Sequence, residues 1–138
     1  MNTIREDHAL SRAGEDYLEA IYRLSIDGSG EGTVRSVDVA EQLGVSKASV
    51  NKALSTLKES GMVEQSRYGR VSLTDAGRRY AALVWRSHRA LRLFLERDLG
   101  VESGVADSEA CLMEHVLSED TMRRLIGYLE SQGISVPE

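Results

Sequence analysis

The chain has 138 residues, 41% of them hydrophobic, and a formal net charge of −5 at pH 7. This length and apolar content are enough for one domain, or for two small ones, with a hydrophobic core. One cysteine excludes an intrachain disulfide, no segment reaches the roughly 18 consecutive apolar residues of a membrane span, and the N-terminal sequence MNTIREDHAL lacks the apolar run of a signal peptide. We therefore expect a globular protein of the reducing cytoplasm with no membrane partner.

Charge is distributed unevenly along the chain. Residues 35–79 contain eight Lys and Arg against five acids, whereas residues 96–138 contain three Arg against ten acids. The net charge argues against a general nucleic-acid binder, but a basic segment can still bind nucleic acid locally. We expect two working parts, a mildly basic one followed by an acidic one.

Residues 15–26 predict an amphipathic helix with an apolar side and a charged side. Asp16 and Glu19 stand three residues apart on the charged side, so both carboxylates can face one ion. Taken alone, such a pair is more often an ordinary solvated helix face. The glycine-rich segment 27–33 predicts a turn or linker without a phosphate-binding pattern, and residues 34–35 predict a short strand.

Residues 36–61 predict two short amphipathic helices joined by a turn. Ser36 is suited to the N-cap of the first helix, and Gly44 is suited to the left-handed conformation that ends it. Ser46 is suited to cap the second helix, which is expected to stop at Gly61. Two such helices form a helix-turn-helix pattern.

Residues 62–66 and 71–73 predict the two strands of a hairpin with a polar, basic tip at 67–70. A helix-turn-helix followed by such a hairpin indicates a winged helix, and the combination is more specific than either half. Recognition helices read base edges while neighbouring basic residues contact phosphates, although the same residues also suit an ordinary solvated surface. The predicted DNA-binding residues are Arg35, Ser46, Lys47, Ser49, Asn51, Lys52, Arg67, Tyr68 and Arg70.

The C-terminal half predicts three helices. A long helix runs from Thr74, which can cap it, to about Asp98, and a glycine-containing break follows at 100–104. A second helix comes after the break, and a third is expected to begin at Ser118 and to stop at Gly133. These helices are rich in leucine, but three helices of this size have too few apolar residues to form a core without a partner. We therefore expect a homodimer.

The second of these helices contains the segment EACLMEH, residues 109–115, with the only cysteine of the chain. Cys111, Glu114 and His115 have the offsets i, i+3 and i+4, which place side chains on one helix face. A thiolate, a carboxylate and an imidazole are ligands for a divalent transition metal. The alternative is that Cys111 is a small buried apolar residue and Glu114 is solvated.

Five segments together resemble the diphtheria toxin repressor and manganese transport regulator family of metal-dependent bacterial repressors. They are EDYLEAIYRL, VDVAEQLGVSKASVNKALSTLKESGMV, VSLTDAGRRYA, WRSHRALRLFL and EACLMEHVLSED, in the order and spacing of that family. The resemblance implies a metal-dependent dimer that binds a palindromic DNA operator. It also implies a set of six metal ligands: Asp16, Glu19, His88, Cys111, Glu114 and His115.

The ligand set implied by the resemblance is a mixture of two branches of the family. The acids Asp16 and Glu19 are similar to the manganese-responsive branch, whereas Cys111 stands where that branch has a glutamate. Oxygen donors suit Mn²⁺, and a thiolate favours Fe²⁺, Co²⁺ or Zn²⁺. We therefore expect Mn²⁺ or Fe²⁺ as the cofactor, with Co²⁺ or Zn²⁺ able to bind in vitro. The iron branch's ancillary site is expected to be incomplete, because Arg92 and Asp107 replace its glutamate and histidine.

The expected fold is mainly α, with an N-terminal winged helix-turn-helix DNA-binding domain over residues 1–73 and a C-terminal helical metal-binding and dimerisation domain over 74–138. We expect this second domain to end the chain without the SH3-like domain of the iron branch. The expected function is repression of metal-uptake genes, with no enzymatic activity.

Two other functions are open at this stage. One is a winged-helix repressor that senses oxidant through Cys111, although the acidic residues around it oppose thiolate formation. The other is a metal-dependent hydrolase, although six donors leave little room for substrate, and catalytic zinc usually has three protein ligands and an open position.

Overall fold

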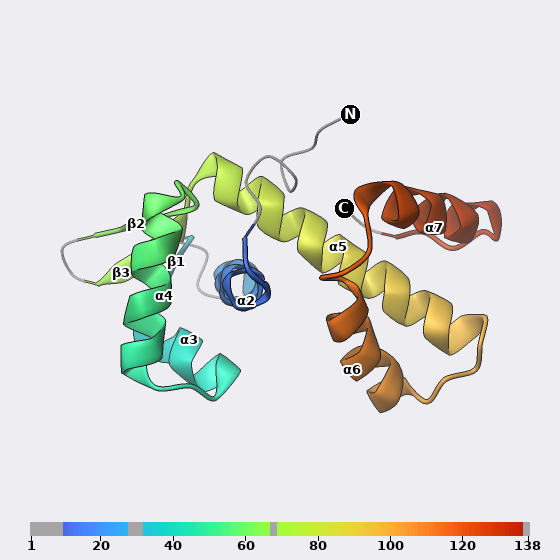
Figure 1. Ribbon diagram of the computed structural model, residues 1–138, viewed down its shortest axis with the longest axis horizontal. Coiled ribbons are helices and arrows are strands. Elements are labelled where there is room, and N and C mark those ends of the chain that lie inside the picture. Colours follow the sequence, from blue (N-terminus) through green and yellow to red (C-terminus); the bar gives the residue numbers. More distant parts are fainter. Residues whose placement is uncertain (1–9, 28–31, 67–68, 137–138) are drawn as a thin grey trace. The chain divides into compact units, whose positions relative to one another are not determined.

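The computed structural model describes residues 10–27, 32–66 and 69–136 (Figure 1). These residues form two compact units, the first ending at Ala82 and the second beginning at Leu83. The boundary falls inside helix α5 (Asp75–Arg97), which contributes residues to both units. Each unit buries its own set of apolar side chains.

Unit 1 combines helices with a small antiparallel sheet and the first turns of α5. The other elements are α2 (Arg12–Asp27), β1 (Thr33–Arg35), α3 (Ser36–Leu43), α4 (Lys47–Glu59), β2 (Val63–Gln65) and β3 (Arg70–Leu73). The strand order is β1-β3-β2, so β2 and β3 form the predicted hairpin and β1 pairs with the other edge of β3. Helices α3 and α4 followed by this hairpin confirm the winged helix-turn-helix predicted from the sequence.

The two helices of the helix-turn-helix begin and end for different local reasons. Gly44 adopts a φ of 66°, and its left-handed conformation ends α3 as predicted. The Oγ of Ser46 accepts a hydrogen bond from the backbone N–H of Ser49 at 3.1 Å, which confirms the predicted cap of α4. The prediction that Ser36 caps α3 is wrong, because Ser36 is already helical and Arg35 takes the N-cap position without a side-chain cap.

The core of unit 1 lies between the helices and the sheet. Its buried apolar side chains include Leu18, Ile21, Val34, Val39, Val50, Leu54, Leu57, Met62, Val71, Tyr80 and Ala81. The alternation on β3 places Val71 and Leu73 inside the core. At the start of α5, the hydroxyl of Thr74 accepts a hydrogen bond from the N–H of Gly77 at 3.0 Å, which confirms the predicted cap.

Gly77 is required by close packing. A Cβ at this position would lie 1.9 Å from the carbonyl oxygen of Met62, inside van der Waals contact with backbone. The first turn of α5 therefore passes the end of α4 and the start of β2 at a distance that only glycine permits.

Unit 2 consists of the remainder of α5 with α6 (Ser103–Met113) and α7 (Glu119–Ser131). The Oγ of Ser118 accepts from the N–H of Thr121 at 3.1 Å, as expected of the cap of α7. The break between α5 and α6 covers residues 98–102 and not the predicted 100–104, because α5 ends at Arg97, Glu102 caps α6 and Ser103 is its first residue. The three helices share one apolar cluster: Ala90, Leu91, Leu95, Ala106, Ala110, Met122, Leu129 and Val136.

No helix within the described ranges is long and apolar enough to span a membrane.

Candidate metal centre and nucleic-acid interface

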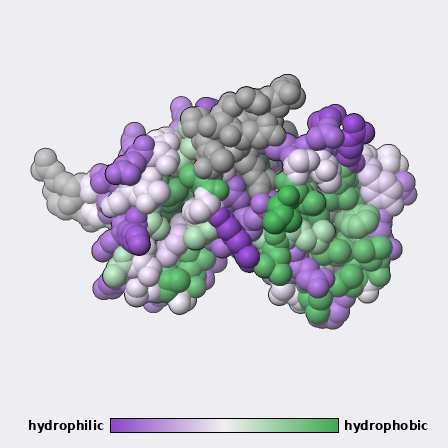
Figure 2. Space-filling model, viewed as in Figure 1, coloured by the Kyte–Doolittle hydropathy of each residue, from purple (hydrophilic) through white to green (hydrophobic). Residues whose placement is uncertain are grey.

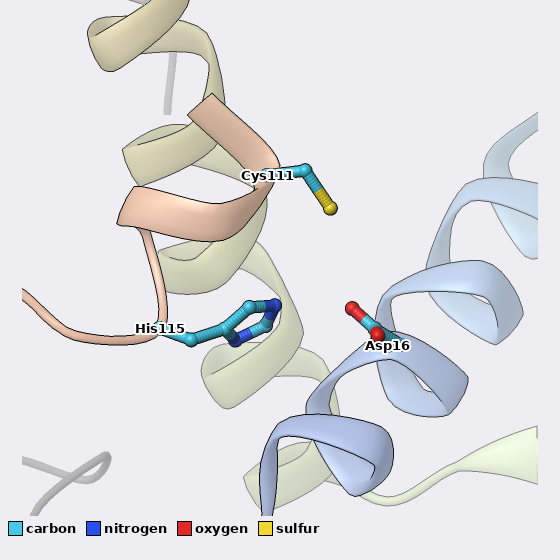
Figure 3. A group of neighbouring side chains, drawn as sticks. All are labelled: Asp16, Cys111 and His115. Carbon is cyan, nitrogen blue, oxygen red and sulfur yellow. The ribbon is translucent and has the colours of Figure 1, made fainter. Parts of the chain in front are cut away.

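The segment EACLMEH crosses the C-terminal end of α6. Helix α6 ends at Met113, and Glu114 is its C-cap with helical angles and an N–H bonded to the carbonyl of Ala110 at 2.9 Å. His115 lies beyond the helix, so the prediction of one regular helix through all three donors is wrong for His115. The donor atoms of Cys111 and His115 nevertheless lie within 4.8 Å of one another, and Figure 3 draws both side chains on the same side of α6.

His88 of α5 and Glu114 form a buried pair within unit 2. Nδ1 of His88 lies 3.2 Å from Oε1 of Glu114, and the exposed fraction of Glu114 is 0%. Removing a carboxylate from water costs free energy unless donors or a cation compensate. A cation bound beside this pair would compensate the buried charge of Glu114.

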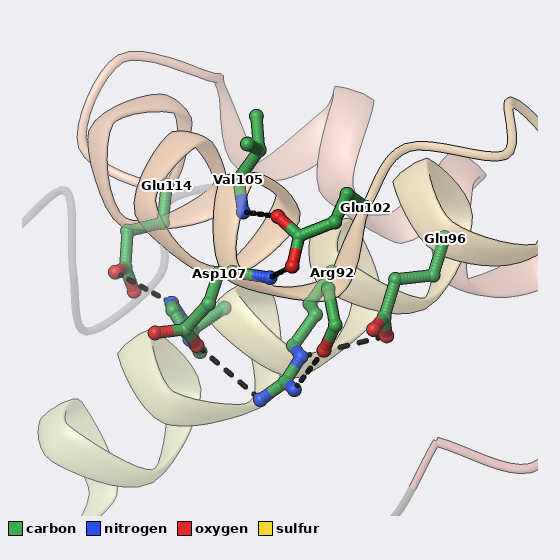
Figure 4. A network of polar contacts seen from close by, with 9 residues as sticks. Arg92, Glu96, Glu102, Val105, Asp107 and Glu114 are labelled. Carbon is green, nitrogen blue, oxygen red and sulfur yellow. Dashed lines mark hydrogen bonds and ion pairs between the residues drawn. The ribbon is translucent and has the colours of Figure 1, made fainter.

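A charged network extends from the other edge of the His88 ring (Figure 4). Nε2 of His88 lies 2.9 Å from Oδ1 of Asp107 on α6. The same oxygen lies 3.4 Å from Nη1 of Arg92, whose Nη2 donates to Oγ of Ser103 at 2.8 Å. Glu96 lies 3.4 Å from Nε of Arg92. Both nitrogens of the imidazole therefore face a carboxylate, and the carboxylate of Asp107 also faces the guanidinium of Arg92.

Trp85 holds the plane of the His88 ring. The two ring centroids are 5.5 Å apart with an interplanar angle of 8°, and the guanidinium of Arg89 lies 5.3 Å from the centroid of Trp85. Trp85 was not among the residues predicted for the site, although its offset of three residues from His88 on a helix is a signal for such stacking.

The two predicted acidic ligands of unit 1 lie on α2. Asp16 and Glu19 are half-buried, and Figure 3 draws the side chain of Asp16 on this helix. Their neighbour Glu15 is buried and accepts a 2.6 Å hydrogen bond from the hydroxyl of Tyr80. The pairing of Glu15 with Tyr80 could not be predicted from the sequence, because a bond between residues so distant in the chain leaves no local pattern.

The chemistry of the donors fits a divalent transition metal. Carboxylate, imidazole and thiolate donors suit Mn²⁺, Fe²⁺, Co²⁺ or Zn²⁺ better than the hard ions Ca²⁺ and Mg²⁺, which prefer oxygen alone. Two donors that bind one ion at right angles, with bonds of about 2.1 Å, lie about 3 Å apart. The separation of 3.2 Å between His88 Nδ1 and Glu114 Oε1 matches that spacing.

The exposed face of α4 carries the central part of the predicted DNA surface. Lys47, Ser49, Asn51 and Lys52 are exposed, whereas the apolar side of the helix is buried. Ser46 is exposed as well, but its hydroxyl is used to cap the helix and lies 3.0 Å from Oγ of Ser49. The face that points away from the core is therefore polar and basic at its N-terminal end.

The remaining predicted DNA contacts have different surroundings. The guanidinium of Arg35 donates to Asp38 at 3.0 and 3.1 Å, and this hydrogen-bonded pair raises the pKa of Arg35 and lowers that of Asp38. Arg70 donates from Nε to Oγ1 of Thr33 at 3.0 Å and so bridges β3 to β1. Arg67 and Tyr68, predicted at the tip of the wing, lie outside the described residues.

Comparison with known families agrees with both units. Residues 9–71 match the family described as iron dependent repressor, N-terminal DNA binding domain, and residues 74–132 match the iron dependent repressor, metal binding and dimerisation domain.

Individual relatives agree with this assignment. The iron-dependent repressor of Mycobacterium tuberculosis is 33% identical over 117 residues, covering 85% of this chain and 50% of that protein. An uncharacterised HTH-type transcriptional regulator of Methanocaldococcus jannaschii is 29% identical and is covered to 95% of its length. The solved structure of a manganese-dependent transcriptional repressor in complex with manganese has a TM-score of 0.75 at 32% identity, covering 91% of this chain and 58% of that one.

The chain thus spans about half the length of the iron-dependent repressors that it matches. The order of the two matched domains is the order of the two predicted parts. The winged helix, the donor-rich α6 and the two domain matches lead to one conclusion: the chain belongs to the iron-dependent repressor family, the family of the diphtheria toxin repressor.

Proposed function

We propose that this protein is a metal-responsive repressor that binds a palindromic DNA operator as a homodimer and reduces the expression of metal-uptake genes when Mn²⁺ or Fe²⁺ is plentiful. The observation that carries the proposal is the buried pair of His88 and Glu114 in a chain that also contains a helix-turn-helix. Since the family consists of transcriptional repressors, the alternative of a metal-dependent hydrolase is wrong.

The proposed ligands come from both units. His88, Cys111, Glu114 and His115 belong to unit 2, and Asp16 and Glu19 belong to α2 of unit 1. Asp16 would add a carboxylate to the thiolate of Cys111 and the imidazole of His115, and all three are donors that a divalent transition metal accepts. The half-buried position of Asp16 and Glu19 supports their inclusion, since acids on a purely solvated face would be exposed.

The identity of the ion depends on how the thiolate competes with the oxygen donors. Cys111 favours Fe²⁺, Co²⁺ or Zn²⁺, whereas three carboxylates favour Mn²⁺. Anaerobic titration of chelator-stripped protein with Co²⁺, followed by competition with Mn²⁺, measures this preference. A thiolate-to-metal charge-transfer band at saturation would support Cys111 as a ligand. Absence of saturable binding would contradict the proposal.

Metal binding would be coupled to DNA binding through the helices that carry the ligands. A bound ion supplies positive charge that offsets the repulsion among the carboxylates. Donors on α2, α5 and α6 favour the arrangement in which they can share one ion, and that arrangement is the one proposed to bind DNA. A coupling free energy of about 1–3 kcal/mol is sufficient for such a switch.

Surface composition supports a homodimer. Figure 2 shows apolar residues gathered on the drawn face of unit 2. The exposed apolar side chains of this unit include Val116 at 78% and Leu99 at 61%, together with Val105 and Leu112. Clustered apolar surface of this kind is typical of a protein interface. Two copies related by twofold symmetry would present two α4 helices to a palindromic operator.

The proposal is tested by metal-stimulated DNA binding. An operator is first selected from a pool of random duplexes in the presence of Mn²⁺, and affinity is then measured by gel shift with and without the ion. Glu114→Gln removes the charge of a buried donor and should abolish the stimulation. Glu109→Gln, which changes an exposed acid of the same helix, is the matched control and should leave it unchanged. Full stimulation in Glu114→Gln would disprove the proposed mechanism.

A further inference from the structure

Asp107 is outside the six predicted ligands, yet it contacts one of them. Its Oδ1 lies 2.9 Å from Nε2 of His88, on the ring edge away from Glu114. We propose that Asp107 is the positioning residue of His88: it fixes the ring and the tautomer in which Nδ1 presents its lone pair to the ion. This inference rests on the proposed function, because it assigns a role toward the same metal site.

The tautomer follows from the two contacts of the ring. A neutral imidazole has one N–H and one lone pair, and the group that accepts from the N–H decides which nitrogen is left for a metal. Both ring nitrogens face a carboxylate, but Asp107 lies closer to Nε2, at 2.9 Å, than Glu114 lies to Nδ1, at 3.2 Å. A cation bound beside Glu114 would also exclude a proton from Nδ1, so the proton belongs on Nε2 and the Nδ1 lone pair faces the ion. In metal sites the second nitrogen of a histidine ligand usually donates to such a carboxylate or to a carbonyl, and this raises the basicity of the ligating nitrogen.

Asp107 is itself held in place. Nη1 of Arg92 lies 3.4 Å from the oxygen that faces His88, and Nη2 of Arg92 bonds to Ser103 in the first turn of α6. Figure 4 draws Asp107 beside the guanidinium of Arg92, with a dashed line between them. The Asp107 side chain is 52% exposed, so its carboxylate needs such a partner to keep one orientation. Trp85, stacked at 8° to the imidazole, limits rotation of the ring itself.

The position of Asp107 distinguishes a positioning residue from a seventh ligand. Nδ1 and Nε2 lie on different edges of the imidazole, so a carboxylate bonded to Nε2 does not reach an ion bound at Nδ1. Glu114 at 3.2 Å from Nδ1 has the spacing of a fellow ligand, and Asp107 does not contact that nitrogen. The metal site should therefore lose affinity without losing a donor when Asp107 is changed.

The first experiment is an anaerobic Co²⁺ titration of the full chain. Asp107→Ala should weaken binding about ten- to a hundredfold, the usual effect of removing the partner of a ligating histidine. Asp107→Asn, whose amide oxygen can still accept a hydrogen bond from Nε2–H, should lose less Co²⁺ affinity than Asp107→Ala. Glu109→Ala removes an exposed acid of α6 and controls for the change in net charge. Equal affinity in Asp107→Ala and the wild type would overturn the proposal, as would equal losses in all three variants.

The second experiment reads the tautomer directly. Protein with ¹⁵N-labelled histidine is loaded with Zn²⁺, and long-range ¹H–¹⁵N correlation identifies the protonated nitrogen of His88. The wild type should carry the proton on Nε2, and Asp107→Ala should exchange that proton faster with water. A proton on Nδ1 would overturn the proposal. If the wild type binds no metal at all, the proposed function fails first, whereas metal binding with the wrong tautomer contradicts this inference alone.

Discussion

The hydroxyl of Tyr80 donates a 2.6 Å hydrogen bond to Oε2 of Glu15 and accepts one from the backbone N–H of Leu10 at 3.1 Å. Tyr80 is fully buried and Glu15 is 5% exposed. This contact joins α5 to the first turn of α2 inside unit 1, one residue before Asp16. The chain therefore fixes the helix that carries two proposed ligands by means of a bond that involves neither of them.

Removal of the Tyr80 hydroxyl should destabilise unit 1. In Tyr80→Phe a buried carboxylate loses a donor and the partly buried N–H of Leu10 loses an acceptor, which costs about 1–3 kcal/mol. Denaturant unfolding followed by circular dichroism measures the change. Tyr22→Phe is the control, because Tyr22 is a half-buried residue of α2 whose hydroxyl bonds to no other residue in the described part of the chain. Equal stabilities of the two variants would show that the Tyr80 bond contributes nothing.

A methyl group at position 77 should be tolerated poorly. Gly77→Ala places a Cβ 1.9 Å from the carbonyl oxygen of Met62, so the first turn of α5 must move away from Met62. Overpacking against backbone costs about 1–3 kcal/mol or more. Gly127→Ala is the matched control within α7, where an added Cβ has no heavy atom within 4 Å and alanine should stabilise the helix by up to about 1 kcal/mol. Thermal unfolding should show a lower melting temperature than the wild type for Gly77→Ala and a higher one for Gly127→Ala.

The stability of α6 should depend on pH through Glu102. Its carboxylate accepts from the N–H groups of Gly104 and Val105 at 3.0 Å, and these bonds lower the pKa of Glu102 below its ordinary value of 4.5. A group with a lowered folded-state pKa stabilises the fold above its unfolded-state value, and the effect is lost as the pH falls through the folded value. Glu102→Ala should therefore be less stable than the wild type at pH 7, and the difference should narrow below pH 4.5. A difference independent of pH would contradict the role of the charge.

Lys47 at the start of α4 should contribute to DNA affinity. Lys47→Ala should weaken binding to the selected operator and reduce the slope of log K against log salt by about one, as expected for the loss of one phosphate contact. Lys58→Ala makes the same change in charge at the other end of α4, where it is also exposed, and should have a smaller effect. Gel shifts over a range of salt concentrations compare the two. Identical behaviour would mean that the N-terminal end of α4 does not meet DNA.

Metal removal should lower thermal stability. A ligand that binds only the folded protein stabilises it by about 2.7 kcal/mol at a free concentration one hundred times its Kd. Addition of Mn²⁺ or Co²⁺ to chelator-treated protein should therefore raise the melting temperature, and excess chelator should reverse the effect. In Glu114→Gln the melting temperature should no longer respond to the ion. A response of the same size in this variant would remove Glu114 from the ligand set.

Most of the secondary structure was determined by short sequence signals. Gly44, Ser46, Thr74 and Ser118 end or begin helices as predicted, because capping is decided by a few neighbouring residues. The failure at Ser36 has the same origin: a serine before an apolar run can be the N-cap or the first helical residue, and the sequence does not distinguish them.

The sequence by itself also determined the family, through segments in the family's order and spacing. It further predicted a list of donor residues: spacing on a helix groups Cys111, Glu114 and His115, and the family resemblance implies the full set. It could not determine where α6 ends, and so placed His115 on a regular helix. Tertiary structure alone decided that His88 pairs with Glu114 and Asp107, that Glu15 bonds to Tyr80, and that Gly77 meets Met62. These contacts join residues far apart in the chain, and their partners are selected by packing in three dimensions, which leaves no periodic pattern in the sequence.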